Sequence, residues 1–332
     1  MELSIVIPLY NEEESLRELV RWIDSVTQAN KLSSEIILID DGSTDNSWLV
    51  VNEIREEYPQ VKGARFAVNH GKSAALHVGF GLCTGDVVIS MDADLQDSPD
   101  EIPELFRMIM KENYDLVSGW KKKRLDPLSK TIPTKIYNAT VKWVHGIRLH
   151  DMNCGLKAYK RDVVKSLEVY GEMHRFIPVI AKAAGFNKIG EKVVEHRARK
   201  YGKTKFGMNR FINGFLDLLT ITFITKYTRR PMHFFGFWGT ISALIGASVL
   251  GTFGIIKILD LSGAIDPFPL INHIPALFFG TVAFLLGILL FSTGLLAELI
   301  GRNSPIRNNY QVKETVGFSR EKESVETSHT GS

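Results

Sequence analysis

The sequence has little cysteine and almost no net charge. Only two cysteines, Cys83 and Cys154, occur among 332 residues, and they lie far apart. The 40 lysines and arginines nearly balance the 37 aspartates and glutamates, so the composition gives no indication of nucleic-acid binding. The opening MELSIVIPLY is a short apolar run without a basic leader, which does not fit a signal peptide. These features predict a reducing, cytosolic environment for most of the chain.

Two common nucleotide-binding motifs are also missing. HGKS at 70–73 looks like the end of a phosphate-binding P-loop, but the first glycine of that motif would fall at Phe66. GFGLCTG at 79–85 resembles a dinucleotide fingerprint, yet it closes a predicted helix instead of opening one. A P-loop enzyme is therefore excluded, and a nicotinamide-dependent enzyme is strongly disfavoured.

Long hydrophobic runs occur only near the end of the chain. Residues 234–256 contain no charged side chain, and at ~1.5 Å per helical residue they would span roughly 30 Å, the thickness of the hydrocarbon core of a bilayer. A second run covers 274–297, and the residues between the runs are too few for a domain. The sequence predicts a transmembrane hairpin, and a buried pair of core helices is the alternative.

Basic residues flank this hairpin on one side. They are Lys226, Arg229 and Arg230 before the first run and Arg302 and Arg307 after the second, against only Lys257 in the connection. The positive-inside rule then predicts a multi-pass protein of the cytoplasmic membrane with both termini in the cytoplasm. A stripe of small residues, Ala243, Ala247 and Gly251, would pack the two spans together or support a homo-oligomer.

Ahead of the hairpin, apolar strands alternate with amphipathic stretches. The strands are expected at 3–9, 35–40, 63–68 and 86–92, and this alternation predicts an α/β fold with a mostly parallel, Rossmann-like sheet. Acidic clusters follow three of the strands: YNEEES, DDGSTDNS and DADLQD. Because ligands bind at the carboxyl ends of parallel strands, we expect these clusters to converge on one crevice.

The third cluster places three carboxylates within six positions, namely Asp92, Asp94 and Asp97. Crowded carboxylates repel one another and raise the cost of ionisation. This pattern predicts a cationic partner at the end of the fourth strand.

Five motifs carry a resemblance: SIVIPLYNEEESL, ILIDDGSTDNS, NHGKSAALHVGF, TGDVVISMDADLQDSPDEIPEL and RKYGKTKFG. In this order, and followed by a two-span hairpin, they resemble the inverting GT-A glycosyltransferases of family 2. Among these, the chain is most similar to the group of dolichol-phosphate mannose synthase and bactoprenol (undecaprenyl)-phosphate glycosyltransferases. The resemblance covers roughly residues 3 to 305.

The resemblance implies transfer of a sugar from a UDP- or GDP-sugar to polyprenyl (undecaprenyl or dolichyl) phosphate at the cytoplasmic face. It also implies inversion at the anomeric carbon and dependence on Mg²⁺ or Mn²⁺. Two alternatives stay open: transfer to another lipid or glycan acceptor, and a non-catalytic sugar-nucleotide-binding partner of a membrane complex.

The resemblance and the hydrophobic runs together predict four segments. A GT-A catalytic domain covers 1–205. Amphipathic helices at the membrane surface cover 206–231, and the alternative for this segment is packing in the core. The transmembrane pair lies within 232–300. The tail, 301–332, is polar and lacks apolar periodicity, so we expect it to be largely disordered.

Carried over position by position, the resemblance assigns the donor and metal sites. A divalent ion held by carboxylate oxygens neutralises the diphosphate of a sugar nucleotide, and its expected ligands are Asp94 and Gln96. The donor-binding residues implied are Pro8, Tyr10, Glu12, Asp40, Asp41, Asp92 and Asp94. Asp97 is expected instead at a helix N-terminus, because DSPDE opens the next helix. For the cluster DDGSTDNS the alternative is a structural role, in which Ser43 or Thr44 caps a helix.

The acceptor is expected at two basic stretches, WKKKRLDPLSKTIPTK and HRARKYGKTKFG. A lipid phosphate at the bilayer surface needs such cations. The candidates are Lys121, Arg124, Lys130, Lys135, Arg199, Lys203 and Lys205, with Arg199 and Lys203 the strongest. The family typically has arginine where this chain has Lys121. A lysine cannot bind a phosphate through two parallel hydrogen bonds as an arginine does. Lys122, Lys123 and Lys200 are interpreted as solvated surface charge.

Asp151 is the expected catalytic residue. It stands just before Cys-Gly in LHDMNCGLKAYKR, and no other carboxylate lies between Asp126 and Asp162. An inverting transfer needs a group that deprotonates or orients the acceptor oxygen. Because a phosphate acceptor is already ionised near neutral pH, Asp151 would orient it or pair with a nearby lysine. The alternative is that Asp151 only closes a turn with Asn153.

Overall fold

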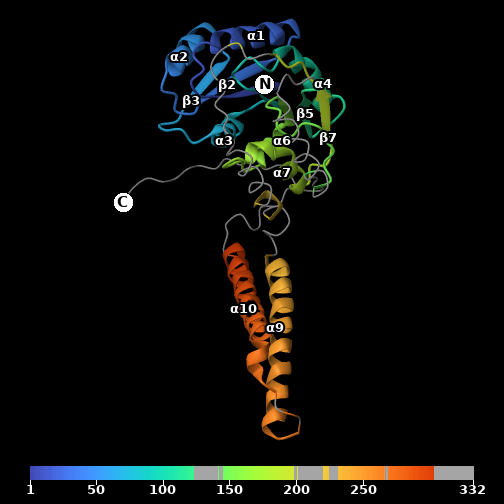
Figure 1. Ribbon diagram of the computed structural model, residues 1–332. Helices are drawn as coiled ribbons and strands as arrows, with labels where there is room; N and C mark the ends of the chain where they lie inside the picture. The colour runs from blue at the N-terminus through green and yellow to red at the C-terminus, as the bar shows by residue number, and fades with distance from the viewer. Residues whose placement is uncertain are drawn as a thin grey trace, which may run out of the picture.

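The computed structural model describes residues 1–122, 141, 145–197, 200, 220–223, 231–264, 266 and 268–302. They form an α/β domain at one end and a pair of long helices at the other (Figure 1). The domain is built on one seven-stranded sheet with the order β3-β2-β1-β4-β6-β5-β7. Its strands are β1 (Leu3–Leu9), β2 (Ser34–Asp40), β3 (Val61–Arg65), β4 (Val87–Ser90), β5 (Leu116–Trp120), β6 (Lys157–Lys160) and β7 (Ile189–Val193).

The sheet is mostly parallel, as the sequence predicts. β1, β2, β3 and β4 run in one direction, β5 and β7 are parallel to each other, and β6 runs antiparallel to both β4 and β5. All four expected strands are present, β1 with the expected bounds and the other three with shifted bounds. β3 ends at Arg65 because its partner strand β2 ends at Asp40, the residue paired with Arg65. Beyond Arg65, the N–H of Phe66 still donates to the carbonyl of Asp40, but the expected extension to 68 has no further strand residue to pair with.

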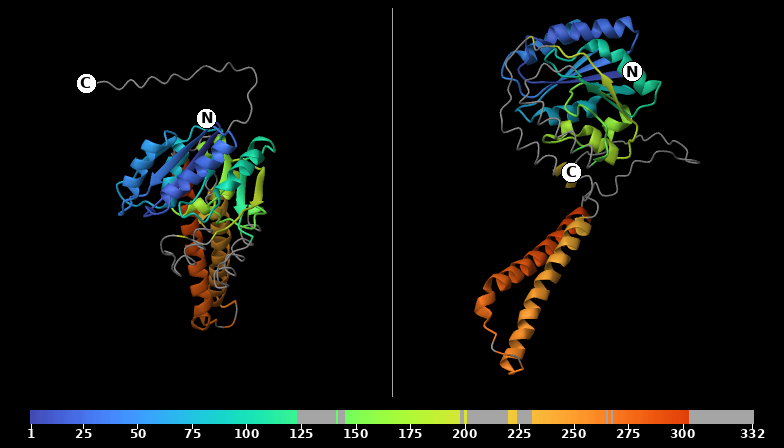
Figure 2. Two further views of the ribbon diagram at one scale, coloured as in Figure 1. Left: turned by 90° about the horizontal axis from the view of Figure 1, so that it is seen from above. Right: turned by 45° about the vertical axis from the view of Figure 1, so that its right-hand side comes forward.

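Helices cover both faces of this sheet (Figure 2). One layer contains α1 (Leu16–Ala29), α2 (Ser47–Glu57) and α4 (Ile102–Met110), and the other contains α3 (Lys72–Leu82), α6 (Arg161–Lys165) and α7 (Ile177–Ala183). Alternate strand residues serve the two layers: Ile5 and Ile7 pack with α1, whereas Val6 packs with α3. This period of two follows from the pleat of a strand, and it produces two separate apolar cores.

The two hydrophobic runs lie in α9 (Pro231–Leu261) and α10 (Ile274–Arg302). Their most apolar windows, in Pro231–Leu261 and Leu270–Ile300, have mean hydropathies of 1.8 and 2.4 and are only 6% and 11% buried. A pair of core helices would be mostly buried, so that alternative is disfavoured. Both helices are long and apolar enough to cross a membrane.

Glycines allow α9 and α10 to pack closely. A Cβ on Gly246 would clash with the backbone nitrogen of Phe284, and one on Gly287 would clash with that of Ala243. Of the stripe expected from sequence, only Ala243 takes part, since Ala247 is exposed and a Cβ on Gly251 would meet no atom within 4 Å. The packing stripe is therefore Gly239, Ala243 and Gly246, and a homo-oligomer stays a prediction.

The edge of the sheet opposite the acidic loops holds a buried carboxylate, Glu35. It accepts hydrogen bonds from the hydroxyl of Ser4 at 2.5 Å and the backbone N–H of Thr84 at 2.7 Å, and it pairs with the ammonium group of Lys62 at 2.6 Å. Burial would raise the pKa of Glu35, but these partners lower it from 4.5 to about 2. The ionised form thus stabilises the fold.

We predict that Glu35→Gln destabilises the protein by about 2 kcal/mol at pH 7, because the charge-assisted bonds are lost. The folded-state pKa lies below the unfolded one, so this contribution is present above pH 4.5 and is lost as the pH falls through the folded pKa. The difference between the two proteins should shrink by roughly half at about pH 3. Thermal unfolding of the detergent-solubilised chain measures it, with exposed Glu56→Gln as the control; an equal difference at both pH values would contradict the prediction.

Candidate active site

The loops after β1 and β2 are bound to each other. The backbone N–H groups of Asn11 and Glu12 donate to the hydroxyls of Ser43 and Ser47, each at 2.9 Å, and the N–H of Thr44 donates to the side-chain oxygen of Asn11 at 2.8 Å. Asn11 takes a positive φ of 56°, which turns the chain sharply after the strand. Two of the three acidic clusters thus form one unit, and Ser43 serves this contact instead of capping a helix.

Asp40 and Asp41 lie at the end of β2, and both are buried. The carboxylate of Asp40 accepts the N–H of Ser43 at 2.8 Å and lies 3.3 Å from the guanidinium of Arg65. The carboxylate of Asp41 accepts the N–H groups of His70 and Gly71 at 2.7 and 2.9 Å. Both side chains hold the loops that follow β2 and β3, and their contact with a donor stays a prediction.

In the third cluster, which follows β4, partly accessible and buried side chains alternate along the chain. Asp92, Asp94 and Gln96 are partly accessible, whereas Ala93, Leu95 and Asp97 are buried. Leu95 has a φ of +60°, and the N–H of Gln96 donates to Oδ1 of Asp94 at 3.2 Å. The loop therefore turns the three polar side chains expected at the donor and metal toward its accessible side.

Asp92 is paired with Lys72 from the start of α3, and its carboxylate lies directly against Gly155, where a Cβ would be 2.5 Å from Oδ2. Burial alone would raise the pKa of Asp92. The ammonium groups of Lys72 and Lys121 outweigh that effect and lower the pKa to about 2. Asp92 is thus ionised at every physiological pH.

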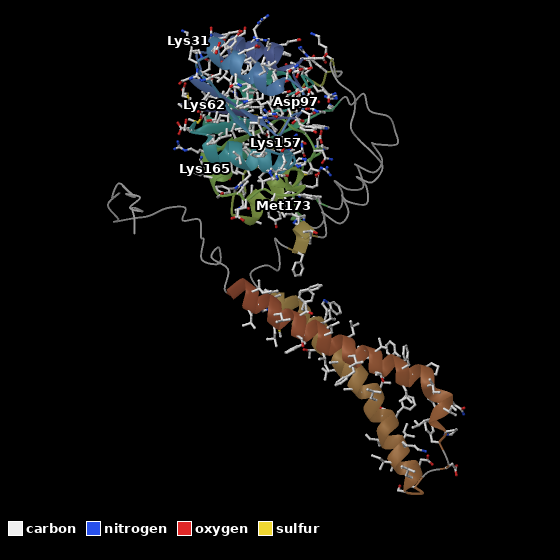
Figure 3. The ribbon with its side chains drawn as sticks, turned by 90° about the vertical axis from the view of Figure 1, so that its left-hand side faces the viewer. Lys31, Lys62, Asp97, Lys157, Lys165 and Met173 are labelled. Carbon is white, nitrogen blue, oxygen red and sulfur yellow. The ribbon has the colours of Figure 1, made fainter. Side chains whose placement is uncertain are left out.

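Asp97 corrects an expectation from the sequence. The following 3₁₀ helix, η1 (Pro99–Glu101), has Ser98 at its N-cap. Asp97, which is labelled in Figure 3, is fully buried. Its carboxylate lies 2.7 Å from the ammonium group of Lys121, whose side chain is 12% exposed. Burial would lower the pKa of Lys121, but the Asp97 carboxylate raises it above its usual value. Lys121 thus has an internal partner, and a role with the acceptor phosphate stays a prediction.

Asp151 is 1% exposed. Its Oδ1 accepts the N–H of Asn153 at 3.0 Å, so the turn considered for this residue is present. The neighbouring Lys157 is also buried and donates to the carbonyl of Cys154. Burial lowers the pKa of Lys157, while the carboxylates of Asp151 and Asp92 act in the opposite direction. Asp151 and Asp92 therefore both act electrostatically on the same buried lysine.

Sequence reasoning missed Lys72, Lys157 and His174. Lys72 belongs to HGKS, which by itself suggests only a P-loop remnant, and it contacts an aspartate 20 positions away. His174 precedes α7, and its Nδ1 lies 2.9 Å from the hydroxyl of Ser73. Burial lowers the pKa of His174 to about 2, so the ring is neutral. HGKS is part of NHGKSAALHVGF, one of the five motifs that carry the family resemblance. This membership could have indicated that Lys72 belongs to the site.

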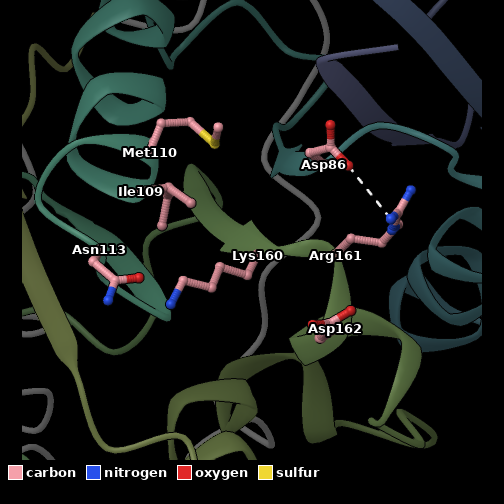
Figure 4. A pocket seen from close by; sticks show the side chains of 7 residues that line it. All are labelled: Asp86, Ile109, Met110, Asn113, Lys160, Arg161 and Asp162. Atoms are coloured by element: carbon pink, nitrogen blue, oxygen red, sulfur yellow. Dashed lines mark ion pairs between the residues drawn. The ribbon is translucent and has the colours of Figure 1, made fainter. Parts of the chain in front are cut away.

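Six of the acceptor candidates lie outside the described residues: Arg124, Lys130, Lys135, Arg199, Lys203 and Lys205. The described residue Arg197 donates its backbone N–H to the carbonyl of Gln96 at 3.0 Å. Lys200 pairs with Glu18 at the surface, at 2.7 Å, as expected of a solvated charge. A separate pocket, bordered by the Asp86–Arg161 ion pair at the amino end of β4 (Figure 4), contains none of the expected site residues.

Among the described residues, no group of three or more histidine, cysteine, aspartate or glutamate side chains could hold a metal ion alone. A divalent ion at Asp94 would therefore need further oxygen ligands from outside this set. Mg²⁺ is commonly held in this way, by one or two carboxylates together with substrate phosphates. Asp94 and the adjacent amide of Gln96 fit that requirement.

A mostly parallel sheet with three acidic loops at its carboxyl edge, the last carrying Asp-x-Asp, is the arrangement of the GT-A fold, which glycosyltransferases use. The model of "Glycosyl transferase family 2" matches residues 4–167. The chain is 35% identical to dodecaprenyl-phosphate galacturonate synthase of Rhizobium johnstonii, over 91% of this chain and 88% of that protein. It is 33% identical to undecaprenyl-phosphate 4-deoxy-4-formamido-L-arabinose transferase of Klebsiella pneumoniae, with the same coverage. The chain belongs to glycosyl transferase family 2.

Solved structures agree on the fold. Glucosyl-3-phosphoglycerate synthase from Mycobacterium tuberculosis, in complex with phosphoglyceric acid, superposes with a TM-score of 0.51 at 18% identity. The match covers 68% of this chain and 79% of that one. The same enzyme in complex with Mn²⁺ and UDP-glucose gives a TM-score of 0.50 at 20% identity, over 68% and 78% of the two chains.

The ion pair between Lys72 and Asp92 makes a prediction about pH. Lys72→Met removes the largest influence that lowers the pKa of Asp92, so this pKa rises and Asp92 becomes protonated in mild acid. The ratio of kcat/KM for sugar transfer at pH 5.5 to that at pH 7.5 should fall by roughly 3-fold or more. Lys72→Arg, which keeps the charge, should retain the wild-type profile. Two pH profiles of the same shape for Lys72→Met and wild type would refute this role.

Proposed function

We propose that this protein transfers a sugar from a nucleotide sugar to a polyprenyl phosphate at the cytoplasmic surface of a membrane, with inversion at the anomeric carbon. The observation that carries the proposal is the loop after β4, where Asp92, Asp94 and Gln96 share the accessible side, in a chain that also carries an apolar helix pair. The relatives named for transfer to dodecaprenyl and undecaprenyl phosphate match nearly the whole chain and support this acceptor.

The donor diphosphate lies at the accessible side of this loop in our proposal. Asp94 and Gln96 would hold Mg²⁺ or Mn²⁺, which when bound neutralises the charge that develops on the leaving nucleotide. Crystals of a protein with the same fold contain Mn²⁺ and UDP-glucose, which supports a divalent ion. Pro8 at the end of β1 and Tyr10 and Glu12 in the loop that follows would line the base and ribose, together with Asp40 or Asp41 at the end of β2.

Asp151 is the residue we assign to the acceptor. Its carboxylate is fixed by the Asn153 N–H and lies close enough to Lys157 to oppose the lowering of that residue's pKa by burial. An ionised phosphate needs little deprotonation, so Asp151 acts mainly by orienting the basic groups and the attacking oxygen. The cations expected to bind the phosphate are Lys121, Arg124, Lys130, Lys135, Arg199, Lys203 and Lys205.

The metal assignment predicts the effect of one substitution. Asp94→Asn removes a charged oxygen ligand at the diphosphate, so transfer should fall by at least ~100-fold while the melting temperature is unchanged. Asp86→Asn is the control, because Asp86 lies at the amino end of the same strand and is 56% exposed. The assay uses radiolabelled UDP- and GDP-sugars with undecaprenyl phosphate, and near-normal wild-type rates in EDTA would refute the metal requirement.

The same assay distinguishes the alternative functions. Label in a glycerolipid or a glycan, with none in undecaprenyl phosphate, would identify a different acceptor. Donor binding measured by calorimetry, with no transfer to any acceptor in native membranes, would identify a non-catalytic binding protein. Label in undecaprenyl phosphate that depends on added Mg²⁺ or Mn²⁺ is the result we expect.

The proposed hairpin predicts which side of the membrane each segment faces. Both native cysteines are buried, so an introduced cysteine can be labelled selectively. In intact cells an impermeant maleimide should modify Ser262→Cys, at the turn between α9 and α10, and should not modify Glu56→Cys in the catalytic domain. After lysis both should react. Labelling of Glu56→Cys in intact cells would reverse the proposed topology.

A further inference from the structure

Glu191 on β7 gathers three hydrogen-bond donors from the loop that carries Asp151. Its Oε1 accepts the backbone N–H groups of His150 at 2.8 Å and of Asp151 at 3.1 Å. Its Oε2 lies 2.7 Å from Nδ1 of the His150 ring. The Glu191 side chain is only 12% exposed. One carboxylate thus binds two consecutive peptide groups and a side chain of the same loop.

The carbonyl of Asp151 is held as well. The hydroxyl of Ser118 on β5 donates to it at 3.4 Å. Ser118 and Glu191 are register partners across the parallel β5–β7 pair. Two neighbouring residues of the sheet therefore hold the N–H and the C=O of the same amino acid, which fixes the direction in which its side chain leaves the backbone.

An aromatic contact completes the support. The ring of His150 stacks on Trp120 of β5 with the ring centroids 4.1 Å apart and an interplanar angle of 14°. Trp120 lies two residues after Ser118, so the two side chains are on the same face of the strand. The stack holds the His150 ring against Glu191 even though the His150 side chain is 65% exposed.

From this geometry we infer that Glu191 is a positioning residue, which sets the orientation of Asp151 for transfer. Charge-assisted bonds to two peptide N–H groups are stronger than neutral ones, and a misplacement of about 1 Å at a reacting group can cost ~100-fold in rate. The inference rests on the proposed role of Asp151. Glu191 itself acts only through the loop that it holds.

The test compares three substitutions of Glu191. Glu191→Ala should lower kcat by roughly 10- to 100-fold, with KM for the nucleotide sugar and its calorimetric affinity within about 2-fold of wild type. Glu191→Gln keeps an oxygen in place for both N–H groups and should retain most of the rate. Glu191→Asp keeps the charge but is one methylene shorter, so it should lose at least ~10-fold. A role of charge alone predicts the reverse order for Gln and Asp and would overturn the inference.

A control and a double mutant separate positioning from general stability. Glu112→Ala removes another carboxylate in an ion pair, 2.6 Å from Arg107 at the opposite end of β5, and should leave kcat unchanged. In the Asp151→Asn background, Glu191→Ala should lower kcat by no more than about 3-fold further, because residues that act as a unit are not additive. A further loss equal to that in the wild-type background would show a purely structural role.

The remaining outcomes distinguish this inference from the proposed function. Asp151→Asn alone should lose at least ~100-fold in turnover with donor affinity retained. If it does, and Glu191→Ala is within 2-fold of wild type, the positioning role is wrong and the role of Asp151 stands. If Asp151→Asn changes turnover only a few-fold, both roles are wrong. If Glu191→Ala does not unfold cooperatively, the order of Glu191→Gln and Glu191→Asp decides.

Discussion

The acidic edge of the sheet depends on lysines that compensate its charge from within. Asp92 is paired with Lys72, Asp97 with Lys121, and the buried Lys157 lies near both Asp92 and Asp151. Burial alone would raise the pKa of Asp92, and the ammonium groups of Lys72 and Lys121 lower it to about 2. The desolvation cost of such buried pairs is high. The charge compensation of Asp92 is thus an internal property of the domain, present before any substrate binds.

This compensation divides the acidic residues into two sets. Asp40, Asp41 and Asp97 are buried, and their carboxylates hold loops and a lysine. Asp92, Asp94 and Gln96 are partly accessible, and Ala93 and Leu95 between them are buried, in the turn that follows the end of β4 at Ser90. A carboxylate that is buried against protein groups has little capacity left for a ligand, whereas a partly accessible one can still bind it. The spacing of Asp-x-Asp therefore leaves both of its carboxylates accessible in this turn.

The sequence was sufficient for those features that follow from local periodicity. Buried apolar runs located β1 to β4, and the shared direction of parallel strands predicted that their acidic loops would lie at one edge of the sheet. Contacts between distant segments had no local signal: Lys72 with Asp92, Lys121 with Asp97, and Glu191 with His150 are joined only by the fold. The expected stripe of small residues, spaced uniformly by four, was wrong as the contact between α9 and α10. Packed helices meet through residues spaced by both three and four. The residue that follows Ala243 in the contact is therefore Gly246 and not Ala247.

The segment 220–223 contacts both the catalytic domain and the helix pair through its side chains. In the described segment 220–223, Ile221 is 1% exposed and belongs to the core on the α3 side of the sheet, and Thr222 lies 3.1 Å from Nε2 of His145. The next residue, Phe223, contacts Phe234 and Phe235 at the start of α9, with ring centroids 6.1 and 5.4 Å apart. With α9 in a membrane, these contacts would hold the catalytic domain close to the membrane surface.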